Sequence, residues 1–91
     1  MPAAVQDVAL VVSNKVTAAQ LKKALQQGAG DLLESIKFFD RYDQIGKDQI
    51  SLAFTLTFRA SDRTLTAEEV ATHRDNAVAQ AHRECGAVLR T

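Results

Sequence analysis

Apolar and polar residues follow two different periods along this chain. From Gln6 to Val12 the run "QDVALVV" is apolar and β-branched, which is typical of a buried strand. From Ile50 to Ala60 the two kinds of residue alternate strictly, as expected for a strand with one buried face and one open or half-open face. The apolar set is Leu52, Phe54, Leu56 and Phe58; the other set is Ser51, Ala53, Thr55, Thr57 and Arg59.

Two segments carry the same signature of a helix N-terminus. Thr17 is followed three residues later by Gln20, and Thr66 by Glu69, so each pair predicts a capping box. Glycines predict the helix ends, at Gly28 or Gly30 for the first helix and at Gly86 for the second. The residues expected to face inward are Leu21, Ala24 and Leu25 in the first helix and Val70, Ala77, Val78, Ala81 and Cys85 in the second.

The remaining segments complete two similar halves. Leu32–Tyr42 is expected to be the second strand, 43–49 a turn containing Gly46, and Ala87–Arg90 a short last strand. The order β-α-β-β-α-β predicts an α+β, ferredoxin-like sandwich with a four-stranded antiparallel sheet and two helices on one face. Right-handed crossovers place the first and third strands at the centre and leave the other face uncovered. We expect one domain over residues 1–91, with its core at 6–90.

Composition narrows the function. Eleven basic and eleven acidic residues give a formal charge of zero, which argues against indiscriminate nucleic-acid binding, because such binding needs surplus cations. No apolar run is long enough to span a membrane, and the single cysteine, Cys85, fits a reducing cytoplasm. No nucleophile–base pair or phosphate-cradling loop is present, so we assign no catalysis to this chain. His82 and Cys85 lack further ligands close in sequence, so a metal site is not expected.

Asp40 and Tyr42 are unusual at the end of a strand. A carboxylate is a poor strand residue, and the phenol two positions on shares its face. Taken singly, Asp40 fits a turn-initiating acid and Tyr42 a ring at the rim of the core. Strict alternation also places Ile36 and Phe38 on the face of Asp40. Either a bulge lies near Phe39, or part of the open face is apolar.

Four spaced motifs, together with "QDVALVV" and "GAVLR", carry a family resemblance. They are Phe39-Asp40-x-Tyr42, Ser51-Leu52-Ala53-Phe54, Arg59 and Arg63-Thr64-Leu65-Thr66-x-x-Glu69. In this order they resemble the C-terminal ferredoxin-fold anticodon-binding domain of the bacterial phenylalanyl-tRNA synthetase β subunit. The resemblance covers Gln6 to Arg90, and it implies an RNA-binding module that contacts the G-A-A anticodon of the phenylalanine tRNA.

The resemblance also implies roles for single residues. The carboxylate of Asp40 would accept both hydrogens on the Watson–Crick edge of guanine, and the ring of Tyr42 would stack on the base. The family positions that match Ser51 and Arg90 also contact the anticodon, and the position of Ala9 approaches it through its backbone. Two departures remove positive charge that the family usually has there: Gln6, and the pair Gln49-Ile50. Lys37, Arg41 and Lys47 are the cations that we expect to compensate in part for this loss of charge.

Partners follow from the same resemblance. We expect the phenylalanine tRNA, the remainder of the β subunit and the α subunit, with no membrane and no DNA. No cofactor is expected in this domain, whereas ATP and Mg belong elsewhere in the parent ligase. A chain of this kind is expected to be the C-terminal part of a longer cytoplasmic protein. A different class stays open: a protein-interaction or regulatory domain that uses the open sheet, for which Asp40, Tyr42 and Ser51 would be incidental.

Overall fold

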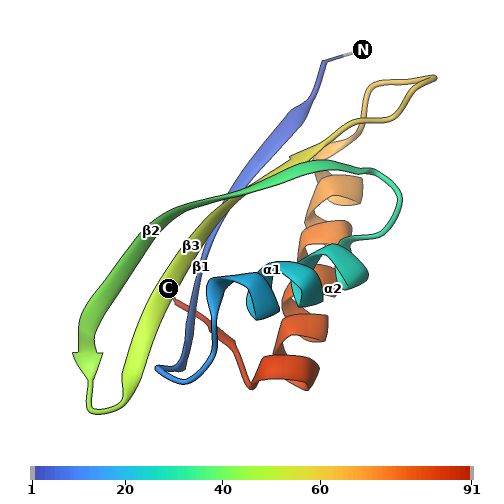
Figure 1. Ribbon diagram of the computed structural model, residues 1–91. Coiled ribbons are helices and arrows are strands. Elements are labelled where there is room, and N and C mark those ends of the chain that lie inside the picture. The colour runs from blue at the N-terminus through green and yellow to red at the C-terminus, as the bar shows by residue number, and fades with distance from the viewer. Residues whose placement is uncertain (1, 91) are drawn as a thin grey trace.

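The computed structural model describes residues 2–90, so the two ends of the predicted domain, Met1 and Thr91, lie outside the described residues. The elements are β1 (Ala4–Ser13), α1 (Ala18–Ala29), β2 (Leu33–Gly46), β3 (Gln49–Phe58), α2 (Ala67–Cys85) and β4 (Val88–Leu89). All strand pairs are antiparallel, in the order β2-β3-β1-β4. Both helices lie on the same side of the sheet (Figure 1). The ferredoxin-like fold is therefore confirmed, with β1 and β3 at its centre.

Both predicted capping boxes are present. The hydroxyl of Thr17 accepts the Gln20 N–H at 3.1 Å, and the Gln20 side chain accepts the Thr17 N–H at 2.9 Å. Thr66 and Glu69 repeat this exchange at 3.1 and 3.2 Å. Each box satisfies two N–H groups that the first turn of a helix would otherwise leave without partners.

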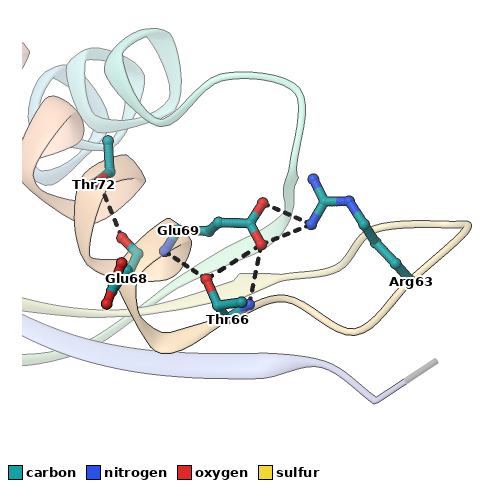
Figure 2. Close-up of polar contacts among 5 residues, drawn as sticks. All are labelled: Arg63, Thr66, Glu68, Glu69 and Thr72. Atoms are coloured by element: carbon teal, nitrogen blue, oxygen red, sulfur yellow. Dashed lines mark hydrogen bonds and ion pairs between the residues drawn. The ribbon is translucent and has the colours of Figure 1, made fainter.

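The second box is reinforced by an ion pair (Figure 2). Arg63 extends from the loop after β3 and its guanidinium lies 2.6 Å from the Glu69 carboxylate. The backbone N–H of Thr66, and then the Arg63 side chain, lower the pKa of Glu69 below its ordinary value of 4.5. The loop that leads into α2 is therefore anchored to the helix it introduces.

The two helices cross closely at Gly28. A Cβ atom at this position would lie 2.4 Å from the backbone oxygen of Asn76 and 2.8 Å from the Cα atom of Ala77. Only glycine leaves room for this approach. The core between the helices and the sheet contains large side chains that are almost fully buried: Leu10, Leu21, Leu25, Phe54, Leu56 and Phe58.

The ends of all four strands differ from the sequence prediction. β3 runs from Gln49 to Phe58 instead of from Ile50 to Ala60. β2 continues to Gly46 instead of stopping at Tyr42, so the turn shrinks to residues 47–48, where Asp48 has a positive φ of 63°. The polar residues at 43–49 suggested a longer turn, but Gly46 pairs with Gln49, so the two strands of the hairpin continue to this point. β1 is longer than predicted, and β4 contains only Val88–Leu89. Within residues 2–90, neither helix is long and apolar enough to cross a membrane.

Candidate functional site

The face of the sheet opposite the helices presents rows of side chains, set by the strand register, and three of these rows surround the candidate site. Neighbouring rows are two residues apart along β1 and β3, about 6.6–6.8 Å. The first row is Tyr42, Ser51, Val11 and Val88; the second is Asp40, Ala53 and Ala9; the third is Lys37, Thr55 and Asp7. We call this surface the open face.

A β-bulge brings Asp40 and Tyr42 onto the open face. The register shifts between Phe38, which pairs with Phe54, and Asp40, which pairs with Ala53. The extra residue is Phe39. Phe38 therefore lies against the helix-side ring of Phe54, at 5.6 Å between centroids, while Asp40 joins the opposite face. Of the two alternatives left by the sequence, the bulge is correct.

The carboxylate of Asp40 is exposed. Within residues 2–90 it takes part in no hydrogen bond or ion pair, so both of its oxygens are available to a ligand. Arg41, the adjacent cation, pairs with Leu52 in the ladder and so faces the other side, where it binds Asp43 at 3.4 Å. The acid is thus not neutralised by its neighbour in sequence.

Tyr42 and Arg90 meet above the open face. The Arg90 guanidinium carbon lies 4.8 Å from the centroid of the Tyr42 ring, a cation–π contact between opposite edges of the sheet. Arg90 is held there because its backbone N–H donates to the Ala9 carbonyl oxygen at 2.7 Å. Tyr42 as a whole is still 41% exposed.

Small residues form the floor beneath this contact. Ser51 and Ala53 are only 3% and 8% exposed, although no helix covers their side of the sheet. Ala9 and Val11 are half-buried beside them on β1. The structure therefore brings all five predicted site residues to one end of the open face, with Ser51 and the Ala9 backbone lower than Asp40, Tyr42 and Arg90.

One departure from the family pattern does not lie where it was expected. Gln6 faces the helices, where its side-chain oxygen accepts a hydrogen bond from Arg74 of α2 at 3.2 Å. The loss of a cation at this position therefore does not change the open face, because alternation directs residue 6 away from it. Ile50 is likewise a core residue at 5% exposure, and Gln49 is exposed at the end of the hairpin.

Sequence reasoning missed a second polar pair on the open face. The hydroxyl of Thr55 donates to the carboxylate of Asp7 at 2.7 Å across β3 and β1. Two signals could have found it: the period-two pattern that turns Thr55 outward, and an aspartate within a central strand, where aspartate is disfavoured.

The histidines and the cysteine are accounted for by local structure. His73 and His82 lie within hydrogen-bond distance of the carbonyl oxygens of Ala29 and Ala87, at 3.0 and 3.1 Å. Burial raises the pKa of the Cys85 thiol, and the charge of Glu84 adds to this effect. Such a thiol is less reactive than an exposed one.

Taken together, the fold and this face define a small α+β domain whose uncovered sheet offers a flat ring, free carboxylate oxygens and a guanidinium. These are the groups that bind single-stranded RNA through its bases. The model of one family, the ferredoxin-fold anticodon binding domain, matches residues 1–90. The chain belongs to this family, as its motifs predicted.

Curated relatives give the same assignment. The β subunits of phenylalanine–tRNA ligase from Streptomyces avermitilis and Thermobifida fusca are each 55% identical to this chain, over 99% and 98% of its length. The corresponding subunit from Mycobacterium leprae is 51% identical over 99% of the chain. The chain spans 11% of the length of each of these relatives.

Proposed function

We propose that this domain binds the anticodon loop of the phenylalanine tRNA as part of a phenylalanine–tRNA ligase β subunit, and that its open face recognises the G-A-A anticodon. The observation that carries the proposal is the bulge at Phe39, which puts the free carboxylate of Asp40 beside Tyr42 on the uncovered side of the sheet. Family membership and the identity of the relatives point to the same partner.

Asp40 selects guanine. The Watson–Crick edge of guanine carries two adjacent N–H donors, and an ionised carboxylate accepts both at once. Adenine and uracil each lack this pair of donors. Within residues 2–90 no protein group competes for the oxygens of Asp40, so the free domain is ready to accept them.

Tyr42 provides the stacking surface. Stacking of a base on an aromatic side chain contributes about 1–3 kcal/mol and does not depend on which base it is. In the free domain the Arg90 guanidinium lies against this ring. When the base takes its place, the guanidinium is released to contact a loop phosphate, so Arg90 brings positive charge to the RNA at this end of the open face.

Ser51 and the backbone of Ala9 contact the bound base from the floor of the open face. Ser51 is the cross-strand neighbour of Tyr42, and Ala9 lies next to Ala53 in the row of Asp40. A base that displaces Arg90 uncovers this floor, so the Ser51 hydroxyl and the Ala9 backbone then come within its reach.

The domain has no catalytic role and needs no cofactor of its own in this proposal. It holds the anticodon end of the tRNA so that the acceptor end reaches the distant active site, where ATP and Mg act. Its partners are therefore the tRNA, the rest of the β subunit and the α subunit, in a cytoplasmic enzyme. The binding energy is used for positioning.

The direct test is an NMR titration of the 91-residue chain with an RNA hairpin whose loop contains G-A-A. Tyr42 is the only tyrosine, so 3-fluorotyrosine labelling gives one fluorine signal that reports this ring alone. We expect the signal to shift with the G-A-A hairpin and to shift much less when the first base is changed. Asp40→Ala, followed by the same fluorine signal, and Tyr42→Ala, followed by the backbone amide signals of Ser51 and Ala53, should each weaken binding by about 1–3 kcal/mol.

A second measurement separates binding from catalysis. In the whole ligase, the same two variants should impair aminoacylation of tRNA while phenylalanine-dependent ATP–pyrophosphate exchange stays unchanged. Equal fluorine shifts for every loop sequence, or loss of adenylate formation in a folded variant, would contradict the proposal. The absence of any shift would favour a domain that docks a protein partner on the open sheet.

A further inference from the structure

The open face carries a second recognition element one row beyond Asp40. Thr55 lies directly opposite Asp7 in the β1–β3 ladder, and its hydroxyl donates to the Asp7 carboxylate at 2.7 Å. Asp7 is exposed. Within residues 2–90 its carboxylate has no ion-pair partner. Because aspartate is depleted in strands, fold stability alone gives little reason for it here.

Once Thr55 and Asp7 are bonded to each other, their side chains can only accept further hydrogen bonds. A threonine hydroxyl has a single hydrogen, and Thr55 gives it to Asp7. What remains is the second carboxylate oxygen of Asp7 and the free lone pair of the Thr55 oxygen, which are both acceptors. A ligand group that satisfies them must donate hydrogen bonds, as the exocyclic amine of adenine does with its two hydrogens. Uracil has no such amine.

The position of the pair fits a neighbouring nucleotide. Its row lies two strand residues from the row of Asp40 and Ala9, about 6.6–6.8 Å away, which is comparable to the separation of successive phosphates along an RNA strand. Lys37 occupies the β2 end of the same row and is exposed. Its ammonium group is a point charge of the kind that contacts phosphate.

We propose that Asp7 and Thr55 form a second base-reading site, which selects an exocyclic amine in the nucleotide next to the one held by Asp40 and Tyr42. Lys37 binds the phosphate between the two nucleotides. This inference rests on the proposed anticodon function, in which the adjacent base is the middle adenine.

Two single-group changes in the RNA hairpin test the two sites separately. Purine riboside at the middle position removes only the amine of adenine, and inosine at the first position removes only the amine of guanine. The initial slope of the fluorine shift of Tyr42 gives relative affinities even where binding is too weak to saturate. With the unchanged 91-residue chain, we expect the purine hairpin to bind about tenfold more weakly than the adenine hairpin.

Variants of the protein then show whether Asp7 and Thr55 are the groups that sense the amine of adenine. In Asp7→Ala the adenine and purine hairpins should differ by less than twofold, because the acceptor is gone. Thr55→Val should reduce the difference as well, whereas Thr57→Val, one row further on the same face, should preserve the tenfold difference. Circular dichroism and urea unfolding establish that each variant is folded.

Each outcome decides between the proposals. If inosine weakens binding and purine riboside does not, the second site is wrong and the anticodon function stands. The second site is also wrong if the purine penalty persists undiminished in Asp7→Ala. If neither RNA change alters binding, the anticodon function fails together with the inference that depends on it.

Discussion

The two faces of β3 share one backbone but differ in role, because one face packs in the core and the other is uncovered. On the helix side Leu52, Phe54 and Leu56 are between 0 and 2% exposed. On the open side Thr55 and Thr57 are half-buried, and Thr55 lies between the charged residues Lys37 and Asp7 of the neighbouring strands. Burying a large apolar side chain contributes about 1.5–3 kcal/mol, so the helix side stabilises the fold. The open side contributes little to stability and is free to carry recognition.

The open face is itself divided. Ser51 and Ala53 are as inaccessible as core residues, and they lie at the end where Arg90 extends over Tyr42. Beyond them the row of Thr55 is more accessible. One end of this face is therefore covered by its own side chains in the free protein, and the other is not.

The largest effect should come from exchanging a side chain on the helix side. Phe54→Ala removes a fully buried ring and should lower the free energy of unfolding by about 3–5 kcal/mol, through lost burial and the cavity left behind. Thr57→Ala on the opposite face should cost about 1 kcal/mol or less. Urea unfolding followed by circular dichroism measures both. Similar losses for the two variants would refute the division between the faces.

The next effect lies between the helices. In Gly28→Ala the new methyl group would overlap the backbone of α2, so we expect a loss of about 1–3 kcal/mol despite the better helix propensity of alanine. Gln27→Ala, an exposed position one residue earlier, is the matched control and should be neutral or slightly stabilising. Thermal unfolding of both variants decides the matter; a stabilised Gly28→Ala would mean that the helices have room to separate.

Local signals explain what could be read from the sequence, and long-range pairing explains what could not. The capping boxes depend on residues three apart, so Thr17 and Thr66 were identified correctly. The bulge at Phe39 remained one of two alternatives because it depends on how β2 registers against β3. The contact of Arg90 with Tyr42 joins residues far apart in sequence, at opposite edges of the sheet, and no local pattern encodes it.

A smaller effect should follow from removing Arg90. Cation–π contacts at exposed sites contribute about 0.5–1 kcal/mol, so Arg90→Ala should be only slightly destabilised. Because the chain has one tyrosine and no tryptophan, its intrinsic fluorescence reports Tyr42 alone. Acrylamide should quench this fluorescence more strongly in Arg90→Ala than in the unchanged chain.

Arg83→Ala is the control for this measurement. The guanidinium of Arg83 donates to the side-chain oxygen of Gln80 on α2 at 2.6 Å. Removing it therefore changes the net charge by the same amount as Arg90→Ala and leaves the open face unchanged. Quenching should stay at the level of the unchanged chain. Equal quenching in Arg90→Ala and Arg83→Ala would show that Arg90 does not cover the ring in solution.

The smallest expected effect is the pH dependence of stability that comes from Glu69, at the start of α2 on the helix side of the sheet. The Thr66 N–H and Arg63 lower the pKa of Glu69, so the folded state favours the ionised carboxylate. A lowered pKa stabilises the fold above the ordinary value of 4.5, and this contribution is lost as the pH falls through the folded pKa. Glu69→Gln keeps an acceptor oxygen for the capping box and loses the charge. It should be less stable than the unchanged chain at pH 7, and the difference should disappear in acid.

The same titration in an Arg63→Ala background isolates the ion pair from the cap. Without the guanidinium, the pH-dependent difference between Glu69 and Gln should shrink but not vanish, because the backbone N–H of Thr66 still favours the carboxylate. RNA binding should be unaffected by either variant at pH 7, since this cluster lies at the start of α2, on the helix side of the sheet. A parallel change in affinity for the G-A-A hairpin would mean that the helix layer and the open face are coupled, which the separate duties of the two faces of β3 exclude.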